Sequence, residues 1–560
     1  MSKHKMKKYK VAIGYPPIET DKGVPLLSQN RQFQFFNAKT FIYPMVPAYA
    51  ASVAQEAGYS VVWMDGIAEE KSYEQWLDEL KEQKPDVLMM ETKAPVVKIH
   101  WEYVEKIKKE IPDLIIVMVG DHVTFKPKET LENSKVDYII TGGDYDFMLT
   151  DLLNSLTKGE ELVGGIWGRE GDKQVKLSEF AKHEEGFWLS GPLKQTQNLD
   201  ELPFVDRDLT KWELYAYDNG NYKYTPATYM YSGKDCWWNR CTFCVWDHTI
   251  NPLGTYRRFS PERLFAEIKH VVDNYGVKEI FDDAGTLFVG PPLKKFCELM
   301  IESGYNKKVV LGCNMRLNAL TQEYYDLMKK ANFRFLLYGL ESANQETLDR
   351  LDKGLKVHQI EEGAKMATKA GLEPHVTIML GYPWETEEMA KNTIALSKHL
   401  FKKGYVETMQ ATTTIPYPGT PLYQECIDNN WLIVDPLDYE KFDMRQPVMK
   451  IPFPEERLYE LIQELYSSFF NPKFIIKKLL SIRSFKDIKF YFYSAWKLLG
   501  HLLDFDKEQT GVTWKSPKFW SNALKSMFTH LFSKKEDSEV EESIEKSSNK
   551  AKKEREAIKV

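Results

Sequence analysis

The chain has 560 residues, which is enough for roughly three or four domains of about 150 residues each. A net charge of −6 excludes an overall basic field of the kind that attracts nucleic acid, and 43% hydrophobic residues can bury substantial cores. Six cysteines are too few for a disulfide scaffold, and neither a signal-peptide pattern nor a run of about 18 apolar residues is found. These features predict a cytoplasmic protein in a reducing compartment, without a nucleic-acid partner.

The first 160 residues alternate short apolar runs with helical patterns. Helices are predicted over 47–57 and 98–110, and strands over 10–17, 59–66, 85–92, 113–122 and 136–143. Such alternation predicts a doubly wound α/β sheet in a Rossmann-type domain, residues 1–160, whose ligand lies beyond the carboxyl ends of the strands. No G-x-G-x-x-G follows the first strand, so the phosphate loop of a dinucleotide site is missing.

A second alternation occupies residues 216–430, after a linker over 161–215. A helix is predicted over 262–275, and strands are predicted to end near Ser232, Asp283, Cys313, Leu340, Leu380 and Thr414. Six strand–helix units indicate a partial (β/α)6 barrel with its chemistry at the carboxyl ends of the strands. Residues 431–532 are predicted to be a helical region. Residues 533–560 hold few large apolar side chains and are predicted to be a disordered tail.

Half of the cysteines fall in one aromatic-rich stretch, "DCWWNRCTFCVW", with the spacing C-x4-C-x2-C: Cys236, Cys241 and Cys244. Thiolates this close favour iron–sulfur or zinc ligation over unconnected core cysteines. Zinc requires a fourth ligand, for which His248 is the nearest candidate, and a plant-type [2Fe–2S] centre requires a fourth cysteine. Cys297 and Cys313 are interpreted as core residues and Cys426 as a surface or core residue. Three thiolates leave one iron of a [4Fe–4S] cube open to a substrate or cosubstrate.

Beyond these cysteines, five segments occur in an order that resembles the barrel of the radical S-adenosylmethionine (SAM) superfamily. They are "FDDAGTLF" (281–288), "CNMRLNAL" (313–320), "LLYGLESANQETLDRLDKG" (336–354), "VTIMLGYPWET" (376–386) and "IPYPGTPLY" (415–423). The usual spacing in that family is C-x3-C-x2-C, so this loop carries one extra residue but keeps three ligands. The resemblance implies a [4Fe–4S] cluster on the three cysteines. It also implies a cofactor-binding set for SAM: Asp282, Asp283, Arg316, Glu341, Ser342 and Gly381.

Each of these signals also has a purely structural interpretation. Taken singly, the Asp282-Asp283 and Glu341-Ser342 pairs could be helix caps, and Gly381 could be a turn glycine. The functional interpretation depends on the segments occurring together and in register.

Residues 9 to about 160 resemble the cobalamin-binding domain of class B radical SAM enzymes, which include hopanoid methylases and the anaerobic magnesium-protoporphyrin cyclase. The resembling segments include "PDVLMMET", "VGDHVTFKPKETL" and "VDYIITGGDYD". The resemblance implies cobalamin against the strand ends that carry Thr92, Gly120, Gly142 and Gly143. The D-x-H-x-x-G motif, whose His ligates cobalt in other cobalamin proteins, is absent, and His122 is interpreted as the support of a loop. The alternative is a vestigial flavodoxin-like domain that only shapes the active site.

The resemblance implies an enzyme that takes one electron from an external donor of the flavodoxin or ferredoxin type, cleaves SAM and functionalises an unactivated carbon. Methyl transfer to a hydrophobic, lipid-like substrate is the leading expectation, and radical ring closure or carbon–carbon bond formation is the alternative. An iron–sulfur electron carrier or sensor is the alternative from another class. The stretch 485–503 has an apolar face opposite lysines, which is typical either of a helix on the core or of peripheral contact with a membrane.

Overall fold

The computed structural model describes residues 9–27, 33–36, 39–171, 174–251 and 253–470, together with 476, 478–480, 482, 488 and 491. The chain divides into two compact units. The first comprises Met1–Asn219, Thr225–Phe288 and Pro416–Asp443. The second comprises Gly220–Tyr224, Val289–Ile415 and Met444–Val560. Among the helices of the described residues, none is long and apolar enough to cross a membrane.

The first unit contains a sheet of eight strands in the order β4-β1-β5-β6-β7-β8-β10-β9. Its parallel part consists of β1 (Lys10–Tyr15), β4 (Ser60–Asp65), β5 (Val87–Thr92), β6 (Ile115–Gly120) and β7 (Tyr138–Ile140). Each of these strands lies within a predicted one, and the doubly wound fold is confirmed. Because β1 has β4 on one side and β5 on the other, the winding reverses there, which favours a ligand crevice at their carboxyl ends. A separate short pair is formed by β2 (Val24–Pro25) and β3 (Phe35–Phe36).

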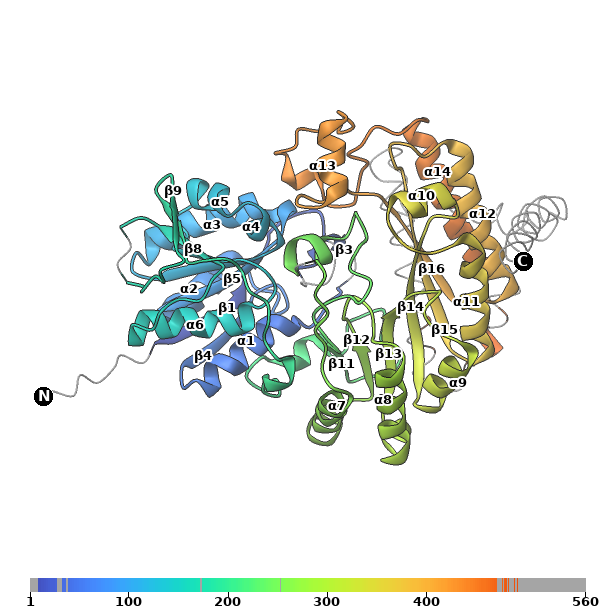
Figure 1. Cartoon of the computed structure of the whole chain (residues 1–560), viewed down its shortest axis with the longest axis horizontal. Helices are drawn as coiled ribbons and strands as arrows, with labels where there is room; N and C mark the ends of the chain where they lie inside the picture. The colour runs from blue at the N-terminus through green and yellow to red at the C-terminus, as the bar shows by residue number, and fades with distance from the viewer. Residues whose placement is uncertain are drawn as a thin grey trace, which may run out of the picture. The chain divides into compact units, whose positions relative to one another are not determined.

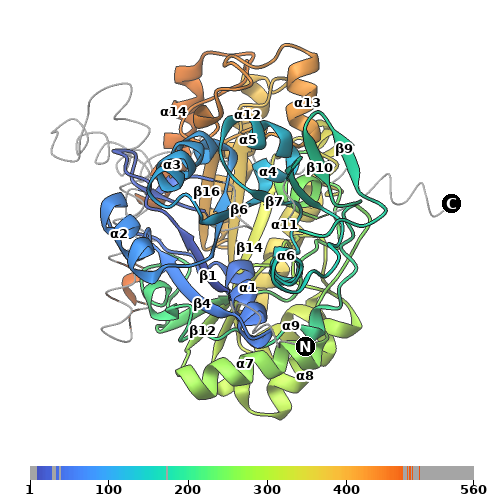
Figure 2. The same cartoon turned by 90° about the vertical axis from the view of Figure 1, so that its left-hand side faces the viewer.

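Helices cover both faces of this sheet (Figure 1). They are α1 (Met45–Glu56), α2 (Tyr73–Gln83), α3 (Val97–Glu110), α4 (Asp121–Phe125), α5 (Pro127–Asn133) and α6 (Tyr145–Lys158). α1 and α6 lie side by side in both Figure 1 and Figure 2. The first unit also contains α7 (Pro261–Tyr275) and α13 (Pro421–Asp428), and the Ser260 side chain caps α7 by accepting a hydrogen bond from Arg263 N–H.

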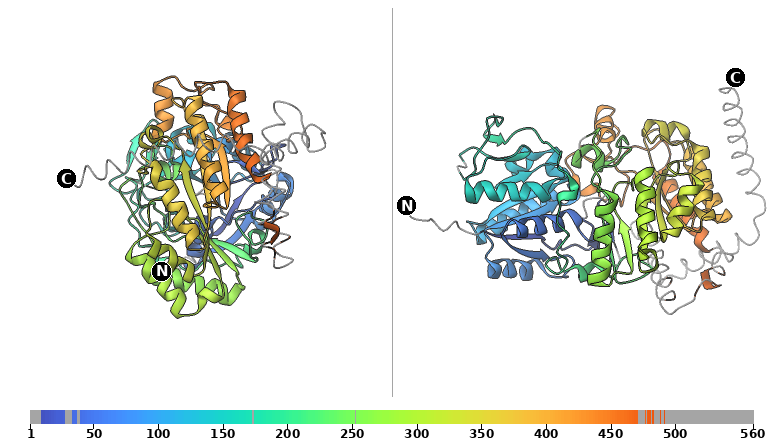
Figure 3. Two further views of the ribbon diagram at one scale, coloured as in Figure 1. Left: turned by 90° about the vertical axis from the view of Figure 1, so that its right-hand side faces the viewer. Right: turned by 60° about the horizontal axis from the view of Figure 1, so that its bottom comes forward.

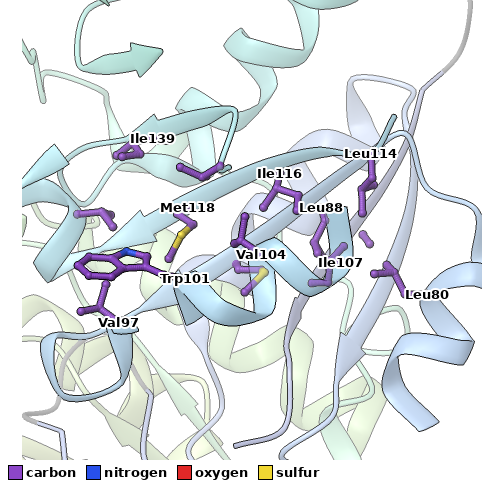
Figure 4. Packing of buried hydrophobic residues seen from close by; sticks show 14 of the residues in the cluster. Leu80, Leu88, Val97, Trp101, Val104, Ile107, Leu114, Ile116, Met118 and Ile139 are labelled. Carbon is purple, nitrogen blue, oxygen red and sulfur yellow. The ribbon is translucent and has the colours of Figure 1, made fainter. Parts of the chain in front are cut away.

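The core between the sheet and α3 follows directly from the helical spacing of apolar residues (Figure 4). Trp101, Val104 and Ile107 lie on one face of α3, where they pack in a cluster with residues of β5 and β6 such as Leu88 and Met118. Full burial of one such side chain contributes about 1.5–3 kcal/mol to the free energy of unfolding. This face of α3 therefore holds β5 and β6 in place. The loops that follow these strands lie at the carboxyl edge of the sheet.

The segment 161–215, expected to be a linker, contributes three strands to the first sheet. β8 (Ile166–Arg169), β10 (Phe187–Leu189) and β9 (Lys182–Glu184) extend the sheet in antiparallel pairing beyond β7. They are only three or four residues long, too short for a recognisable alternation. Trp188 is fully buried here, and a Cβ on Gly168 would lie 2.3 Å from its ring, so the glycine makes room for the indole.

The second sheet has six strands in sequence order, with β11 and β16 at its edges. The strands are β11 (Ala227–Met230), β12 (Glu279–Asp282), β13 (Val310–Met315), β14 (Phe333–Glu341), β15 (Glu373–Leu380) and β16 (Thr408–Thr413). Each predicted strand end lies within two residues of the observed end, and Cys313 lies inside β13, two residues before Met315. The pairs β11–β12, β13–β14, β14–β15 and β15–β16 are all parallel, as expected for a partial barrel.

Within residues 289–415 and 444–470, the second unit contains six α-helices. They are α8 (Pro291–Glu302), α9 (Gln322–Lys330), α10 (Gln345–Arg350), α11 (Val357–Lys369), α12 (Glu387–Lys403) and α14 (Glu455–Ser467). The yellow and orange helices α11 and α12 cover the strands in the left view of Figure 3. Helix α14 lies in the region predicted to be helical, 431–532. The predicted tail 533–560 and nearly all of the amphipathic stretch 485–503 lie outside the described residues.

Candidate active site

The three clustered cysteines lie in the loop that follows β11. Cys241 is buried, while Cys236 and Cys244 are partly buried. A turn, in which Cys244 N–H donates to the Cys241 carbonyl at 3.0 Å, brings the last two cysteines together. Burial first, and then the negative charge of Asp247, raises the pKa of Cys236 to about 12 and that of Cys244 well above its usual value. Thiolates in this loop therefore require a cation such as iron beside them.

The donor set fits a [4Fe–4S] cluster better than a single zinc ion. His248, the candidate fourth zinc ligand, has its Nε2 at 3.1 Å from the Cys241 carbonyl oxygen, so this nitrogen already has a partner. Cys297, Cys313 and Cys426 are all buried in the core and lie on α8, β13 and α13. Three thiols in one loop match the ligand number of a cube with one open iron.

Bulky aromatic side chains surround the cysteine loop. Trp246 and Phe243 are buried, and Trp237 Nε1 donates a hydrogen bond to the Leu287 carbonyl at 3.2 Å. Gly285, beyond the end of β12, permits the close approach of this loop, because a Cβ there would lie 3.0 Å from Cys236 Cβ and 3.1 Å from the Trp246 ring. The aromatics can therefore keep water away from a cluster and so tune its reduction potential.

Asp282 joins the cysteine loop to the end of β12. Its Oδ1 accepts hydrogen bonds from the Ser232 N–H at 2.7 Å and from the Ala284 N–H at 3.2 Å. Burial raises the pKa of Asp282 to about 6, although these hydrogen bonds oppose the shift. Asp283 is also buried, and its N–H donates to the Met230 carbonyl at 2.8 Å. The structure thus places this pair next to the start of the cysteine loop, and a contact with SAM stays a prediction.

In the second unit, Arg316 and Glu341 both contact Lys353. The Lys353 Nζ lies 2.7 Å from Glu341 Oε1, and Arg316 Nη2 donates to the Lys353 carbonyl. Glu341 has a left-handed φ of 63° at a register shift between β14 and β15, a strained arrangement that is frequent at functional sites. A Cβ on Gly339 would lie 2.1 Å from Glu341 Oε1, so the glycine leaves space for the ion pair. Sequence reasoning missed Lys353, whose only signal was a lysine within the matched fourth-strand segment.

Ser342 and Gly381 have contacts of the structural kind. Ser342 Oγ accepts a hydrogen bond from the Asn344 N–H at 3.2 Å, as a capping serine does. Gly381 has a φ of 87°, which favours glycine, and its N–H donates to Glu385 Oε2 at 2.6 Å. Burial raises the pKa of Glu385 to about 8. The role of both residues toward SAM stays a prediction.

Four residues expected to contact cobalamin lie at the carboxyl ends of β5, β6 and β7 or directly after them: Thr92, Gly120, Gly142 and Gly143. Gly120 has a φ of 120°, and a Cβ there would lie 2.1 Å from the Thr92 carbonyl oxygen. Thr124 Oγ1 donates to the Gly120 carbonyl at 2.6 Å and accepts from the Gly142 N–H at 2.9 Å, which links the two glycine loops. These glycine loops follow three adjacent parallel strands, at the edge where ligands of doubly wound sheets bind, so their position suits a corrin.

His122 supports a loop, as expected. It is fully buried, its Nε2 lies 3.2 Å from Glu129 Oε2, and its ring packs edge-on against Tyr439 with centroids 4.5 Å apart. These contacts hold the ring within the protein.

Sequence reasoning missed a buried polar group at the point where β1 and β5 diverge. Tyr15 Oη donates a hydrogen bond to Glu91 Oε2, and the Tyr145 side chain also hydrogen-bonds the Glu91 carboxyl. Burial raises the pKa of Glu91 to about 7, although Lys93 and these hydrogen bonds oppose the shift, so the group can hold a proton near neutral pH. Lys93 Nζ lies 3.2 Å from Asp121 Oδ2. The signal in the sequence was the charged run Glu91-Thr92-Lys93 directly after an apolar strand.

Two family models match the chain in the same order as its two sheets. Residues 35–147 match the B12 binding domain, and residues 230–396 match the radical SAM superfamily. Every cluster cysteine lies within the second match.

Two relatives cover most of the chain. An uncharacterized methyltransferase from Pyrococcus horikoshii is 28% identical over 79% of this chain and 91% of its own length. The anaerobic magnesium-protoporphyrin IX monomethyl ester cyclase of Cereibacter sphaeroides is 23% identical over 73% of this chain, which spans 63% of that protein.

A solved structure shares the fold. The radical SAM methyltransferase TsrM from Kitasatospora setae, determined with cobalamin and a [4Fe–4S] cluster bound, superposes with a TM-score of 0.59 at 14% identity, over 83% of this chain and 90% of TsrM. The chain is therefore a radical SAM enzyme with a B12-binding domain, and its relatives include an uncharacterized methyltransferase and the anaerobic magnesium-protoporphyrin cyclase.

Proposed function

We propose that the protein transfers a methyl group to an unactivated carbon of a hydrophobic, lipid-like substrate. The observation that carries this proposal is that a three-cysteine loop and the carboxyl edge of a doubly wound sheet belong to the same compact unit. When bound, the cluster with SAM supplies a 5′-deoxyadenosyl radical and cobalamin supplies a methyl carrier. The protein residues position these groups, and the aromatic side chains of the cysteine loop exclude water.

Ring closure is the second candidate reaction, and the relative that favours it is the magnesium-protoporphyrin cyclase. The two candidates differ in the fate of the SAM methyl group. Protein reconstituted anaerobically with iron, sulfide and hydroxocobalamin is given SAM with a deuterated methyl group, a low-potential donor of the flavodoxin type, and lipid or aqueous extracts of its native host. We expect deuterated methyl groups in products of the lipid extract. Label confined to methionine, with a product lighter by two hydrogens, favours ring closure instead, and label in aqueous products contradicts the lipid-like substrate.

Cobalamin is expected to bind without a histidine on cobalt, because the D-x-H-x-x-G motif is absent and His122 is held by Glu129 and Tyr439. Anaerobic reconstitution with hydroxocobalamin should give a near-stoichiometric corrin spectrum after desalting. The electron paramagnetic resonance spectrum of the cobalt(II) form should show no splitting from a protein nitrogen. A protein that retains no corrin supports the vestigial-domain alternative.

We also propose that this cytoplasmic enzyme docks peripherally on membrane through the basic amphipathic stretch 485–503. Flotation with anionic liposomes at low salt tests the contact. Lys478 faces Glu407 and is therefore left unchanged, while Lys477, Lys486 and Lys489 are changed to Glu. We expect the wild-type protein to float and the variant to remain at the bottom of the gradient, because attraction to anionic lipid depends on these charges. Equal flotation of both proteins, or of neither, contradicts the proposal.

A further inference from the structure

A buried network of charges joins the loop after β7 to the start of the cysteine loop. Lys234 Nζ lies 3.0 Å from Asp144 Oδ1, 2.5 Å from Asp146 Oδ1 and 3.2 Å from the Gly143 carbonyl oxygen. The side chains of Lys234, Asp144 and Asp146 are at most 3% exposed. The lysine is two positions before Cys236, and the residues that it contacts belong to the strand edge expected to hold the corrin.

Arg257 closes the network from a third segment of the same unit. Its Nη1 lies 2.5 Å from Asp144 Oδ2, and its Nη2 lies 3.0 Å from Asp235 Oδ1. Asp235 also accepts the Arg257 backbone N–H at 2.6 Å. Three carboxylates and two cations are thus held together out of water, and bidentate contacts of this kind fix geometry as well as charge. The network leaves the backbone from Lys234 to Cys236 little freedom to move independently of the Gly143–Asp146 loop.

Lys234 has an acceptor for each of its three N–H groups. Its ammonium contacts the backbone carbonyl of Gly143 in addition to two carboxylates. Iron bound by Cys236 would fix the backbone that carries Lys234, and a corrin bound at the strand edge would fix Gly143. Binding of the first group orders loop residues that the second group would otherwise have to order. The protein therefore loses less conformational entropy when the second group binds.

We propose that Lys234 is a positioning residue that couples corrin binding at the loop 142–146 to cluster assembly in the cysteine loop. The proposal rests on the proposed function in that both cofactors bind this chain. Coupling between two sites is reciprocal, and it typically amounts to a factor of about 5 to 150 in affinity. Protein that contains the cluster should therefore bind cobalamin at least about fivefold more tightly than the same protein without the cluster.

The experiment measures the affinity of the full-length protein for hydroxocobalamin, with and without the reconstituted cluster, from the change in the corrin absorption spectrum. In Lys234→Met the ratio of the two affinities should fall to about one, because the side chain keeps its length but loses the charge that holds both loops. Lys234→Arg should retain most of the ratio. Lys108→Met is the matched control, since Lys108 forms a partly buried ion pair with Asp137 at 2.7 Å, away from both loops.

If Lys234→Met does not fold, Asp146→Asn tests the same link from the other loop, because it removes the carboxylate at 2.5 Å with little change of shape. A ratio of one in the wild-type protein overturns the proposal. An unchanged ratio in Lys234→Met or Asp146→Asn overturns it as well, as does a ratio lost equally in Lys108→Met. Wild-type protein that binds no corrin in either state overturns the cobalamin part of the proposed function, and the coupling with it, and this result is distinct from binding without coupling.

Discussion

Replacing Cys236, Cys241 and Cys244 together by Ala is expected to abolish both the iron–sulfur chromophore and the cleavage of SAM. The three thiols are the donor set of one loop, and burial raises the pKa of Cys236 and Cys244, so each thiolate forms only with a cation beside it. Without the ligands there is neither a cluster to donate the electron nor an open iron to bind SAM. Iron and sulfide content, and release of 5′-deoxyadenosine under anaerobic reducing conditions, provide the measurements.

The matched controls are Cys297→Ala and Cys313→Ala. Both side chains are fully buried in the core, so their loss leaves small cavities and costs stability without removing a cluster ligand. We expect both variants to keep a full complement of iron and to cleave SAM. A triple variant that retains its iron, or a core variant that loses it while still folded, contradicts the assignment of the cluster to the three-cysteine loop.

Periodicity was sufficient to predict the parallel strands of both sheets, because buried parallel strands form continuous apolar runs. "DLIIVMVGDH" predicts β6 and the loop after it, and the observed strand is Ile115–Gly120. The same reasoning failed for β8, β9 and β10, where burial depends on one tryptophan and on antiparallel pairing with distant residues. Such strands have no local signal, because tertiary contacts decide their pairing.

The candidate site likewise contains residues that the sequence predicts and residues that only the structure shows. The spacing of three cysteines is a local pattern, so the sequence identifies the ligands without any knowledge of the fold. Lys234 and Lys353 act through partners 90 and 12 residues away, and nothing in their immediate neighbours distinguishes them from surface lysines. Their importance comes from burial opposite carboxylates, which only the three-dimensional arrangement shows.

Lys353→Met is expected to destabilise the second unit strongly and to impair SAM cleavage. The Lys353 and Glu341 side chains are 11% and 7% exposed, so the pair is hardly screened by solvent. Removing one partner of a buried ion pair lowers the free energy of unfolding by about 3–5 kcal/mol, because the remaining charge is left buried without a counter-charge. Amide hydrogen exchange along β14 measures this loss as faster opening. Lys391→Met is the control, since its ion pair with Glu387 is exposed to solvent and contributes little to stability.

Stability and function can be separated by the double variant Lys353→Met with Glu341→Gln. A neutral amide costs less to bury than an unpaired carboxylate, so the double variant should regain part of the lost protection in β14. It should not regain SAM cleavage, because Glu341 lies at a strained left-handed position and Gly339 leaves space for its carboxylate in a matched segment of the radical SAM domain. Recovery of both protection and cleavage would show that Glu341 only stabilises β14 and makes no contact with SAM. Recovery of protection alone would show that the Lys353–Glu341 pair is needed for SAM cleavage as well as for the stability of β14.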